Sequence, residues 1–371
     1  MTDKLLPTPR RMLSLDALRG MDMLCIMGLE DVIRELAHWC PTAFLEKLAE
    51  QFEHVPWAGL HAYDLIFPLF MFLSGVSIPL SMDSRLDRGD SRWDMWRKIL
   101  TRCALLILLG MVYNGVFSDK PVGPRFASVL GQIGIAWAIA ASLQLVVRDT
   151  RKRVAILVGW LAATAVLQLL VPVPGHGAGV LTETGAINTW FDRLFLPGRL
   201  HGGSFDPEGI PSAIFAAAIT MAGSLVGTFM KRPDAYSWKT VGTLAATGAA
   251  AVLLGWACWA AGYPPIKSLW TASFNLLAIG IATLLFALFF GIIDVARCQS
   301  WSFALRVIGM NSLTIYLGSK LVSFPDMSAF LFGRVVGPAG DAAPLLLLCG
   351  VLVLEWLVLY FFYRQRWFLR V

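Results

Sequence analysis

Apolar stretches of roughly 20 residues recur along almost the whole chain and alternate with shorter polar segments. A helix of that length crosses about 30 Å of hydrocarbon, so each stretch is long enough to span a bilayer. We identify ten, at about 18–37, 62–82, 99–118, 127–147, 154–172, 211–230, 240–261, 272–294, 303–323 and 342–363. The pattern predicts an all-α, polytopic membrane helix bundle of about ten transmembrane helices, forming one integral-membrane domain over residues 1–371.

Composition supports this class, because 57% of the 371 residues are hydrophobic and only 15% are charged. A mean hydropathy of +0.64 is far too apolar for a soluble domain of this size. The net charge of +6 does not indicate nucleic acid, since the basic residues cluster beside the apolar stretches. There they set topology and contact anionic headgroups, so the expected partner is the lipid bilayer.

The distribution of Lys and Arg predicts the orientation. Basic residues precede the first stretch and fill alternate connections, for example Lys4, Arg10, Arg85, Arg97, Arg148, Arg151, Lys231, Arg297 and Arg366. We therefore expect both termini on the cytoplasmic side and the loop around residue 54 on the outward side. A bacterial inner membrane, with the mouth of the site toward the periplasm, and an organelle membrane of the same polarity fit equally well.

Two outward connections are unusual. The Gly/Pro-rich loop 173–210 is too long for a simple connector, and we expect it to cap a site. Segment 324–341 mixes Phe, Gly and Pro, and re-entrant and simple-loop readings both stay open. Six scattered cysteines without CxxC spacing and five histidines without ligand spacing give no reason to expect a disulfide framework or a metal site.

The richest stretch for chemistry is His54–Ser77, in which a polar loop runs directly into an apolar span. His54 and His61 flank Trp57 in a Pro-Trp-Gly turn, and Asp64 follows where the span begins. An imidazole can take a proton from an amine or attack a thioester, and a carboxylate can fix its tautomer. The alternative is an interfacial histidine satisfied by backbone and water.

The first span also carries charge. Asp16 and Arg19 are three residues apart, so they can pair as a helix anchor, or Arg19 can meet an anionic ligand from the cytoplasm. Glu30 lies near the other end of the same span. Charge inside a membrane segment is costly and usually functional, so we count Glu30 among the candidate site residues.

Six segments in series resemble the family of heparan-α-glucosaminide N-acetyltransferase and its bacterial relatives. They are SLDALRGMDM, HVPWAGLHAYDLIFPLFMFLSGVSIPLS, RFASVLGQIGIAWA, FDPEGIPSAI, PPIKSLWTASF and VIGMNSLTIYLGSKLV, and together they cover nearly the whole chain. The resemblance implies acetyl transfer from cytoplasmic acetyl-CoA, as co-substrate, to the amine of a glucosamine-type sugar on the outward side. It also implies that His54 is the functional histidine, and it is compatible with a homodimer.

Within this resemblance, Glu30 stands where the first span of the animal enzyme carries an asparagine. An amide donates a hydrogen bond whereas a carboxylate accepts one, so Glu30 could act as a base or bind an ammonium group. With His54 and Asp64 it completes our predicted catalytic set.

The other matched segments supply predicted binding residues. For the acceptor these are Asp206, Glu208, Lys267, Asn275, His61 and Trp57, with helix capping as the alternative for Asp206 and Glu208. For acetyl-CoA they are Arg19, Asp16, Asn311 and Tyr316, with helix–helix hydrogen bonding as the alternative for the last two. An acetyl-histidine intermediate and direct transfer with His54 as base both remain open.

Two other functions also fit a multi-span chain. One is O-acylation of envelope glycans, and the other is transport of a small solute. The absence of an evident inverted repeat and the acid–base groups gathered at one membrane face favour the acetyltransferase.

Overall fold

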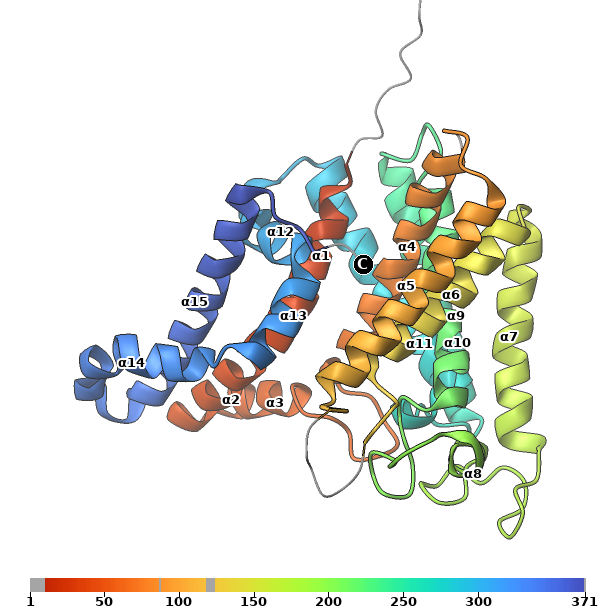
Figure 1. The fold of residues 1–371 in the computed structure, drawn as a ribbon, viewed down its shortest axis with the longest axis horizontal. Helices are drawn as coiled ribbons and strands as arrows, with labels where there is room; N and C mark the ends of the chain where they lie inside the picture. The colour runs from red at the N-terminus through yellow and green to blue at the C-terminus, as the bar shows by residue number, and fades with distance from the viewer. Residues whose placement is uncertain (1–10, 87, 118–123, 370–371) are drawn as a thin grey trace, which may run out of the picture.

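The computed structural model describes residues 11–86, 88–117 and 124–369, and these residues fold almost entirely as helices (Figure 1). They contain two isolated β-bridges and no longer strand. The α-helices are α1 Leu13–Leu24, α2 Glu30–Trp39, α3 Ala43–Gln51, α4 Ile66–Leu86, α5 Arg92–Tyr113, α6 Val129–Val146, α7 Thr150–Leu170, α8 Ile187–Phe195, α9 Ile210–Phe229, α10 Trp238–Ala260, α11 Ala272–Phe290, α12 Phe303–Met310, α13 Ser312–Leu321, α14 Phe324–Val336 and α15 Ala343–Gln365.

Seven helical stretches of the described chain are long and apolar enough to cross a membrane. They are Ala62–Leu86, Val129–Val146, Thr150–Leu170, Ile210–Phe229, Trp238–Ala260, Ala272–Val295 and Phe324–Gln365. The predicted all-α polytopic bundle is confirmed, while ten spans remains a prediction. The orientation rests partly on Lys4 and Arg10, which lie outside the described residues.

The first predicted span is not one regular helix. A π-helical turn, Cys25–Leu29, separates α1 from α2, and Gly28 within it has φ 123°. Only glycine adopts that conformation readily, so the break is encoded locally. The span predicted at 303–323 is likewise divided into α12 and α13 at Asn311, whose φ is −127°.

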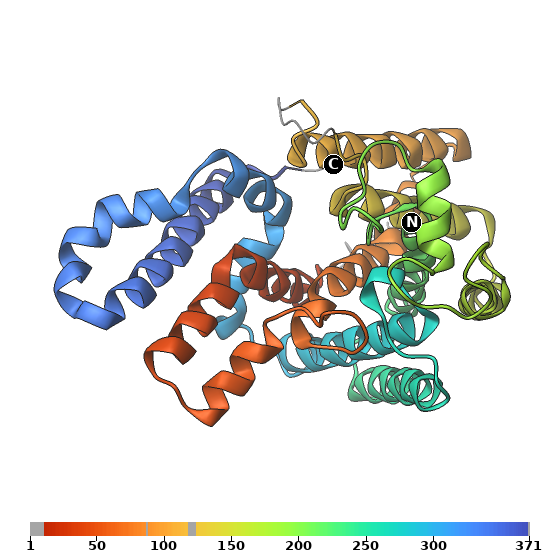
Figure 2. The same ribbon diagram turned by 90° about the horizontal axis from the view of Figure 1, so that it is seen from below.

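Segment 324–341 forms α14 and a short 3-10 helix, Gly337–Ala342. Helix α14 packs against α15, and Ser328 Oγ donates to the Leu347 carbonyl at 2.7 Å. The two helices form a hairpin that projects from the rest of the bundle (Figure 2). Whether this hairpin is re-entrant stays open.

Helix α4 is fixed against α9 by glycines. A Cβ at Gly75 would lie 2.2 Å from the Thr220 carbonyl oxygen, and one at Gly223 would lie 2.1 Å from the Phe72 carbonyl oxygen. Gly227, four residues after Gly223, meets the Val76 carbonyl oxygen in the same way. Small residues at this spacing let membrane helices approach closely, so α4 packs tightly against α9 and is held in a fixed position.

The connections gather at two opposite ends of the bundle. The segment before α4, the loops around α8 and the turn before α11 lie together at the lower end in Figure 1, which we call the His54 end. The connection after α4 lies at the upper end, which we call the Arg85 end. At 1.5 Å per residue, the 21 residues from Asp64 to Arg85 separate the two ends by about 32 Å.

Candidate functional site

His54, Asp64 and Lys267 meet at the His54 end. His54 Nδ1 lies 2.7 Å from Asp64 Oδ1, and Lys267 Nζ lies 3.3 Å from the same oxygen. The other carboxylate oxygen accepts backbone N–H groups of Val55 at 3.3 Å and His61 at 3.2 Å. The Asp64 side chain is only 3% exposed, whereas that of His54 is 56% exposed. The carboxylate is therefore buried and fully bonded, and the imidazole faces outward.

These distances assign the imidazole proton. Lys267 Nζ also lies 3.2 Å from His54 Nδ1, but this nitrogen cannot donate to Asp64 and accept from Lys267 at once. The contact to Asp64 is 0.5 Å shorter (3.2 against 2.7 Å), so we place the proton on Nδ1. The lone pair is then on Nε2, the nitrogen that faces away from the carboxylate, as a nucleophile or base requires.

Lys267 reaches the cluster from a short 3-10 turn, Lys267–Leu269, ahead of α11. Gly59 N–H donates to the Pro265 carbonyl at 2.9 Å, which ties this turn to the His54 loop. Burial lowers the pKa of Lys267, and the Asp64 carboxylate opposes that shift. The lysine thus brings a desolvated positive charge to the site.

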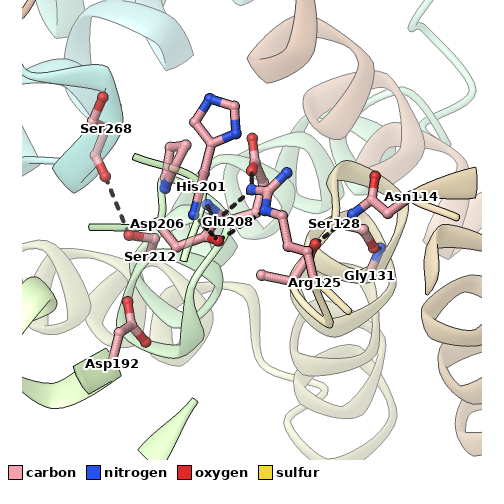
Figure 3. A network of polar contacts seen from close by, with 12 residues as sticks. Asn114, Arg125, Ser128, Gly131, Asp192, His201, Asp206, Glu208, Ser212 and Ser268 are labelled. Atoms are coloured by element: carbon pink, nitrogen blue, oxygen red, sulfur yellow. Dashed lines mark hydrogen bonds and ion pairs between the residues drawn. The ribbon is translucent and has the colours of Figure 1, made fainter. Parts of the chain in front are cut away.

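A second charged cluster joins Arg125, Asp206 and Glu208 (Figure 3). Arg125 donates to both Asp206 oxygens, at 2.8 and 2.6 Å, and also to Glu208 Oε2. The side chains of Arg125, Asp206 and Glu208 are 11%, 0% and 14% exposed. Bidentate pairing of this kind is strong and directional, so the three side chains form a rigid unit.

Local structure fixes Arg125 at this position. Ser128 caps α6 by accepting the Gly131 N–H at 3.0 Å, and Asn114 Nδ2 donates to the Ala127 carbonyl at 2.6 Å (Figure 3). Burial alone would lower the pKa of Arg125, but the hydrogen bond to Asp206 and the charge of Glu208 raise it overall.

The two clusters interact through Glu208 and Lys267. Burial raises the pKa of Glu208, the Arg125 charge lowers it, and the Asp206 charge raises it again. The negative charge of Glu208 in turn acts on Lys267. Trp270 Nε1 also donates to the Pro207 carbonyl at 3.2 Å, between the two acids. The clusters therefore face a common region.

The long loop 173–210 packs on the His54 loop through Trp57. Trp57 Nε1 donates to the Leu181 carbonyl at 2.8 Å, and its ring meets Phe205 edge-on at 5.3 Å. Trp57 thus joins the loop to the site. A capping role for the loop stays a prediction.

Glu30 approaches His54 indirectly. The Tyr63 ring lies 4.8 Å from the His54 ring, and the Tyr63 side chain interacts with Glu30. Glu30 Oε1 pairs with Arg34 at 3.2 Å, while its buried Oε2 has no hydrogen-bond partner among the described residues. Glu30 is the first residue of α2, directly after the turn that contains Gly28.

A cavity of about 490 Å³ follows one face of α4. Its α4 lining is Phe67, Phe70, Ser74, Ser77, Ser81 and Arg85. Spacings of three and four residues place these side chains in one stripe along the helix. The 18 residues from Phe67 to Arg85 correspond to about 27 Å, so the lined face extends between the two ends of the bundle.

Helices α1, α5, α6, α12 and α13 also contribute to the wall of this cavity. Arg19 is among the lining residues, and it donates to Ser77 Oγ at 2.5 Å and to the Leu73 carbonyl at 3.2 Å. Tyr316 lines it as well, stacks on Tyr113 at 4.6 Å and interacts with Glu208. Tyr316 therefore lies in the wall of the cavity within electrostatic range of Glu208.

A second cavity, of about 580 Å³, opens at the Arg85 end and shares Ser81, Arg85 and Arg102 with the first. Arg97 and Lys98 line it too, and the Arg102 guanidinium lies 4.1 Å above the Trp137 ring. Arg102 Nε has no hydrogen-bond partner among the described residues. Basic side chains at an open pocket are suited to an anionic ligand.

Several predicted residues lie apart from the clusters. Asp16 lines the first cavity but pairs with Arg11 at 2.7 Å rather than with Arg19, because Arg19 turns toward Ser77. The His61 ring bonds the Glu53 carbonyl at 3.1 Å, so only its backbone contacts Asp64.

The two predicted asparagines are buried. Asn275 donates to the carbonyls of Phe215 and Trp270, at 3.3 and 2.9 Å. Asn311 is 1% exposed, and neither polar atom of its amide has a partner within the described residues. The structure does not bring either asparagine into the charged clusters, so a ligand role for them stays a prediction.

Sequence reasoning missed Arg125, Tyr63 and the serine stripe of α4. Arg125 had a usable signal, since a basic residue is uncommon in a connection predicted to face outward. The serine stripe had one as well, because Ser74, Ser77 and Ser81 recur at helical spacing inside an apolar span. The role of Tyr63 depends on a fold-level contact that no local pattern reveals.

Fold and site together define a polytopic membrane protein with an acid–base cluster at one end and a basic pocket at the other. Residues 11–172 match a family model described as "Domain of unknown function (DUF5009)". The chain is 27% identical over 332 residues to heparan-alpha-glucosaminide N-acetyltransferase of Homo sapiens, covering 73% of this chain and 49% of that protein. The same-named protein of Mus musculus is 26% identical over 326 residues, with the same coverage. The predicted resemblance is confirmed, and the chain spans about half the length of these relatives.

Proposed function

We propose that this protein transfers the acetyl group of acetyl-CoA to the amine of a glucosamine-type amino sugar, with the two substrates entering from opposite membrane faces. The observation that carries the proposal is the cavity along α4, which shares Ser81, Arg85 and Arg102 with the basic pocket and extends to Phe67, three residues after Asp64. The relatives' printed name supports the reaction class.

The charge and the length of acetyl-CoA determine where we place it in the two cavities. Acetyl-CoA has a multiply charged phosphate end and a long, narrow pantetheine arm. We assign the phosphates to Arg85, Arg97 and Arg102 at the open pocket, where an anion needs little desolvation, since Lys98 already pairs with Asp90 at 2.6 Å. The arm then lies along the α4 stripe, beside serine hydroxyls and Arg19, which can accept or donate hydrogen bonds to its amides.

We place the acceptor sugar beside the acidic residues of the Arg125 cluster. Glu208 keeps 14% exposure and its charge acts on Lys267, so we assign its carboxylate to the acceptor's ammonium or hydroxyls, while the fully buried Asp206 holds Arg125. Arg125 keeps both acids in place. Glu30 is one contact removed from His54, so we assign it to orienting Tyr63 and the imidazole rather than to direct contact with the acceptor.

In the reaction, the C–S bond of the thioester breaks and a C–N bond forms, while the amine proton passes to the leaving thiolate. His54 Nε2 either removes this proton as the amine attacks, or first attacks the carbonyl carbon to form acetyl-histidine. Asp64 stabilises the positive imidazole in both routes, and Lys267 is close enough to offset negative charge on the carbonyl oxygen.

The experiment that tests the reaction is mass spectrometry of acceptors incubated with labelled acetyl-CoA and purified protein. Label on the nitrogen of glucosamine is the expected result, and label on a hydroxyl would instead make the protein an O-acyltransferase. Acetyl-CoA left intact with every amine and sugar acceptor would contradict an enzyme and favour transport.

A single-turnover reaction without acceptor separates the two routes. A labelled acetyl group on His54, found by peptide mapping, indicates the covalent route. Its repeated absence under conditions that give product with acceptor indicates direct transfer.

The outward-facing site follows from the positive-inside pattern, which fits a bacterial inner membrane and an organelle membrane of the same polarity equally well. Sidedness is tested by cysteine labelling in a variant whose six native cysteines are replaced, because Cys40 is free and exposed. A cysteine introduced at Glu53 should react with an impermeant reagent from outside intact cells, and one at Arg88 should not.

A further inference from the structure

We propose that Phe67 and Trp270 form an aromatic wall that limits the acyl group of the donor to two carbons. This inference rests on the acyl-transfer function proposed above and deepens it, because it names the residues that would determine donor specificity.

Phe67 is the last residue of the α4 stripe at the His54 end of the cavity. It follows Asp64 by three residues, which corresponds to a rise of about 4.5 Å along the helix axis. In this proposal the acyl carbon that reacts at His54 lies at the Phe67 end of the cavity, because Asp64, which holds His54 Nδ1, precedes Phe67 by three residues. The substituent on that carbon therefore points either at this ring or back along the cavity, which the pantetheine arm already fills.

Trp270 supports Phe67 from behind. The two rings meet edge-on, with centroids 5.4 Å apart and an interplanar angle of 88°. Trp270 meets Phe274 in the same geometry, at 5.5 Å. Edge-to-face packing is the favoured arrangement of aromatic pairs, so Phe67 belongs to a closely packed aromatic row.

The backbone and indole of Trp270 are also fixed. The residue is 1% exposed, its Nε1 donates to the Pro207 carbonyl at 3.2 Å, and its own carbonyl accepts Asn275 Nδ2 at 2.9 Å. Its φ is +49°, a left-handed conformation that ordinary residues seldom adopt. Such a conformation persists only where the surroundings impose it, which is consistent with a wall that does not yield.

The consequence is a difference between short and long acyl groups. An acetyl methyl needs no space beyond the Phe67 ring, whereas each further methylene must displace an aromatic side chain in a close-packed interior. Discrimination by one methylene in an apolar site is typically about 10- to 200-fold. The wall thus explains how a cavity of about 490 Å³, much larger than an acetyl group, could still select one.

The test compares acetyl-CoA, propionyl-CoA and butyryl-CoA as donors to glucosamine. For wild-type protein, kcat/KM should fall at least about tenfold for each added methylene. In Phe67→Ala, the ratio of butyryl to acetyl transfer should rise by about tenfold or more, because space opens at the wall. Phe67→Leu gives a milder opening if the alanine variant does not fold, and Trp270→Phe opens the second layer.

Phe70→Ala is the matched control. Phe70 lines the same cavity one turn further along α4, so any effect on overall donor binding should leave the butyryl-to-acetyl ratio unchanged. An unchanged ratio in folded Phe67 and Trp270 variants that still transfer acetyl would overturn this inference alone. Absence of transfer from every donor by the wild-type protein would overturn the acyl-transfer function as well.

Discussion

The two charged clusters at the His54 end differ in whether a reactive atom remains accessible. In the Arg125 cluster each charge meets an opposite charge, and all three side chains are nearly inaccessible. In the His54 cluster the carboxylate is buried and saturated, yet the imidazole it holds is more than half exposed and retains Nε2. One arrangement is closed and suits support and positioning, and the other is open and suits chemistry.

This difference shows why charge alone is a poor guide to catalysis in a membrane protein. Both clusters are costly to bury, and both carry a basic residue and a carboxylate. The His54 cluster differs in presenting an exposed nitrogen whose tautomer is fixed, which suits it to accept a proton or an acyl group. Substitutions in the two clusters should therefore affect activity and stability differently.

The largest effect is expected for His54→Ala, because it removes the exposed imidazole to which we assign the proton or acyl transfer. Acetyl transfer should fall about 10²- to 10⁴-fold, while the melting temperature in detergent stays close to that of the wild type. His38→Ala, an exposed histidine on α2, is the matched control. Equal activity of the two variants would remove His54 from the mechanism.

Arg125→Gln should act mainly on stability. It leaves Asp206 and Glu208 buried without their cation, and breaking a buried pair in this way typically costs about 3–5 kcal/mol. We expect a clear loss of folded protein in thermal melting, in contrast to His54→Ala. Asp206→Asn together with Arg125→Gln should recover part of the loss. A melting temperature unchanged by Arg125→Gln would show that the closed cluster is not structural.

The loss of the Lys267 charge should determine how the rate of acetyl transfer falls at alkaline pH. Burial lowers its pKa, so its charge is lost at a lower pH than is usual for a lysine. Acetyl transfer should decline as pH rises through that value, because Asp64 and the carbonyl oxygen lose their cation. Lys267→Arg retains charge at all accessible pH and should move the decline upward, measured as log kcat/KM against pH. Identical alkaline limbs would separate Lys267 from the reaction.

The smallest effect is expected at Asp192, which lies beside the closed cluster. Burial raises its pKa to about 7, and its Oδ1 accepts the Ile210 N–H at 2.9 Å. A pKa raised in the folded state gives a stabilising contribution that is present at acidic pH and lost as pH rises toward and through 7. Asp192→Asn should therefore melt at a higher temperature than wild type at pH 8, and the advantage should shrink at pH 5. The same difference at both pH values would contradict this assignment.

Hydrophobic patterning predicted the bundle well because each span satisfies its backbone internally and needs no distant partner. It did not predict the break at Gly28, which interrupts an otherwise apolar helix, or the interaction of Glu30 with Tyr63. The sequence predicted His54, Asp64 and Lys267 as candidate site residues, but it did not predict their contacts with one another. Their contacts join positions 203 residues apart, and only the packing of the turn before α11 against the His54 loop creates them. Arg125 was missed because its partners lie 81 and 83 residues away.

The proposed function requires the cavity along α4 to connect a donor site at one membrane face to an acceptor site at the other. It is tested most directly in sealed vesicles of uniform orientation, with labelled acetyl-CoA outside and glucosamine trapped inside. We expect labelled N-acetylglucosamine in the lumen of vesicles whose outer surface carries the Arg85 end. Vesicles that carry the His54→Ala variant in the same orientation should give none. Product that forms only when both substrates are on the same side would contradict it.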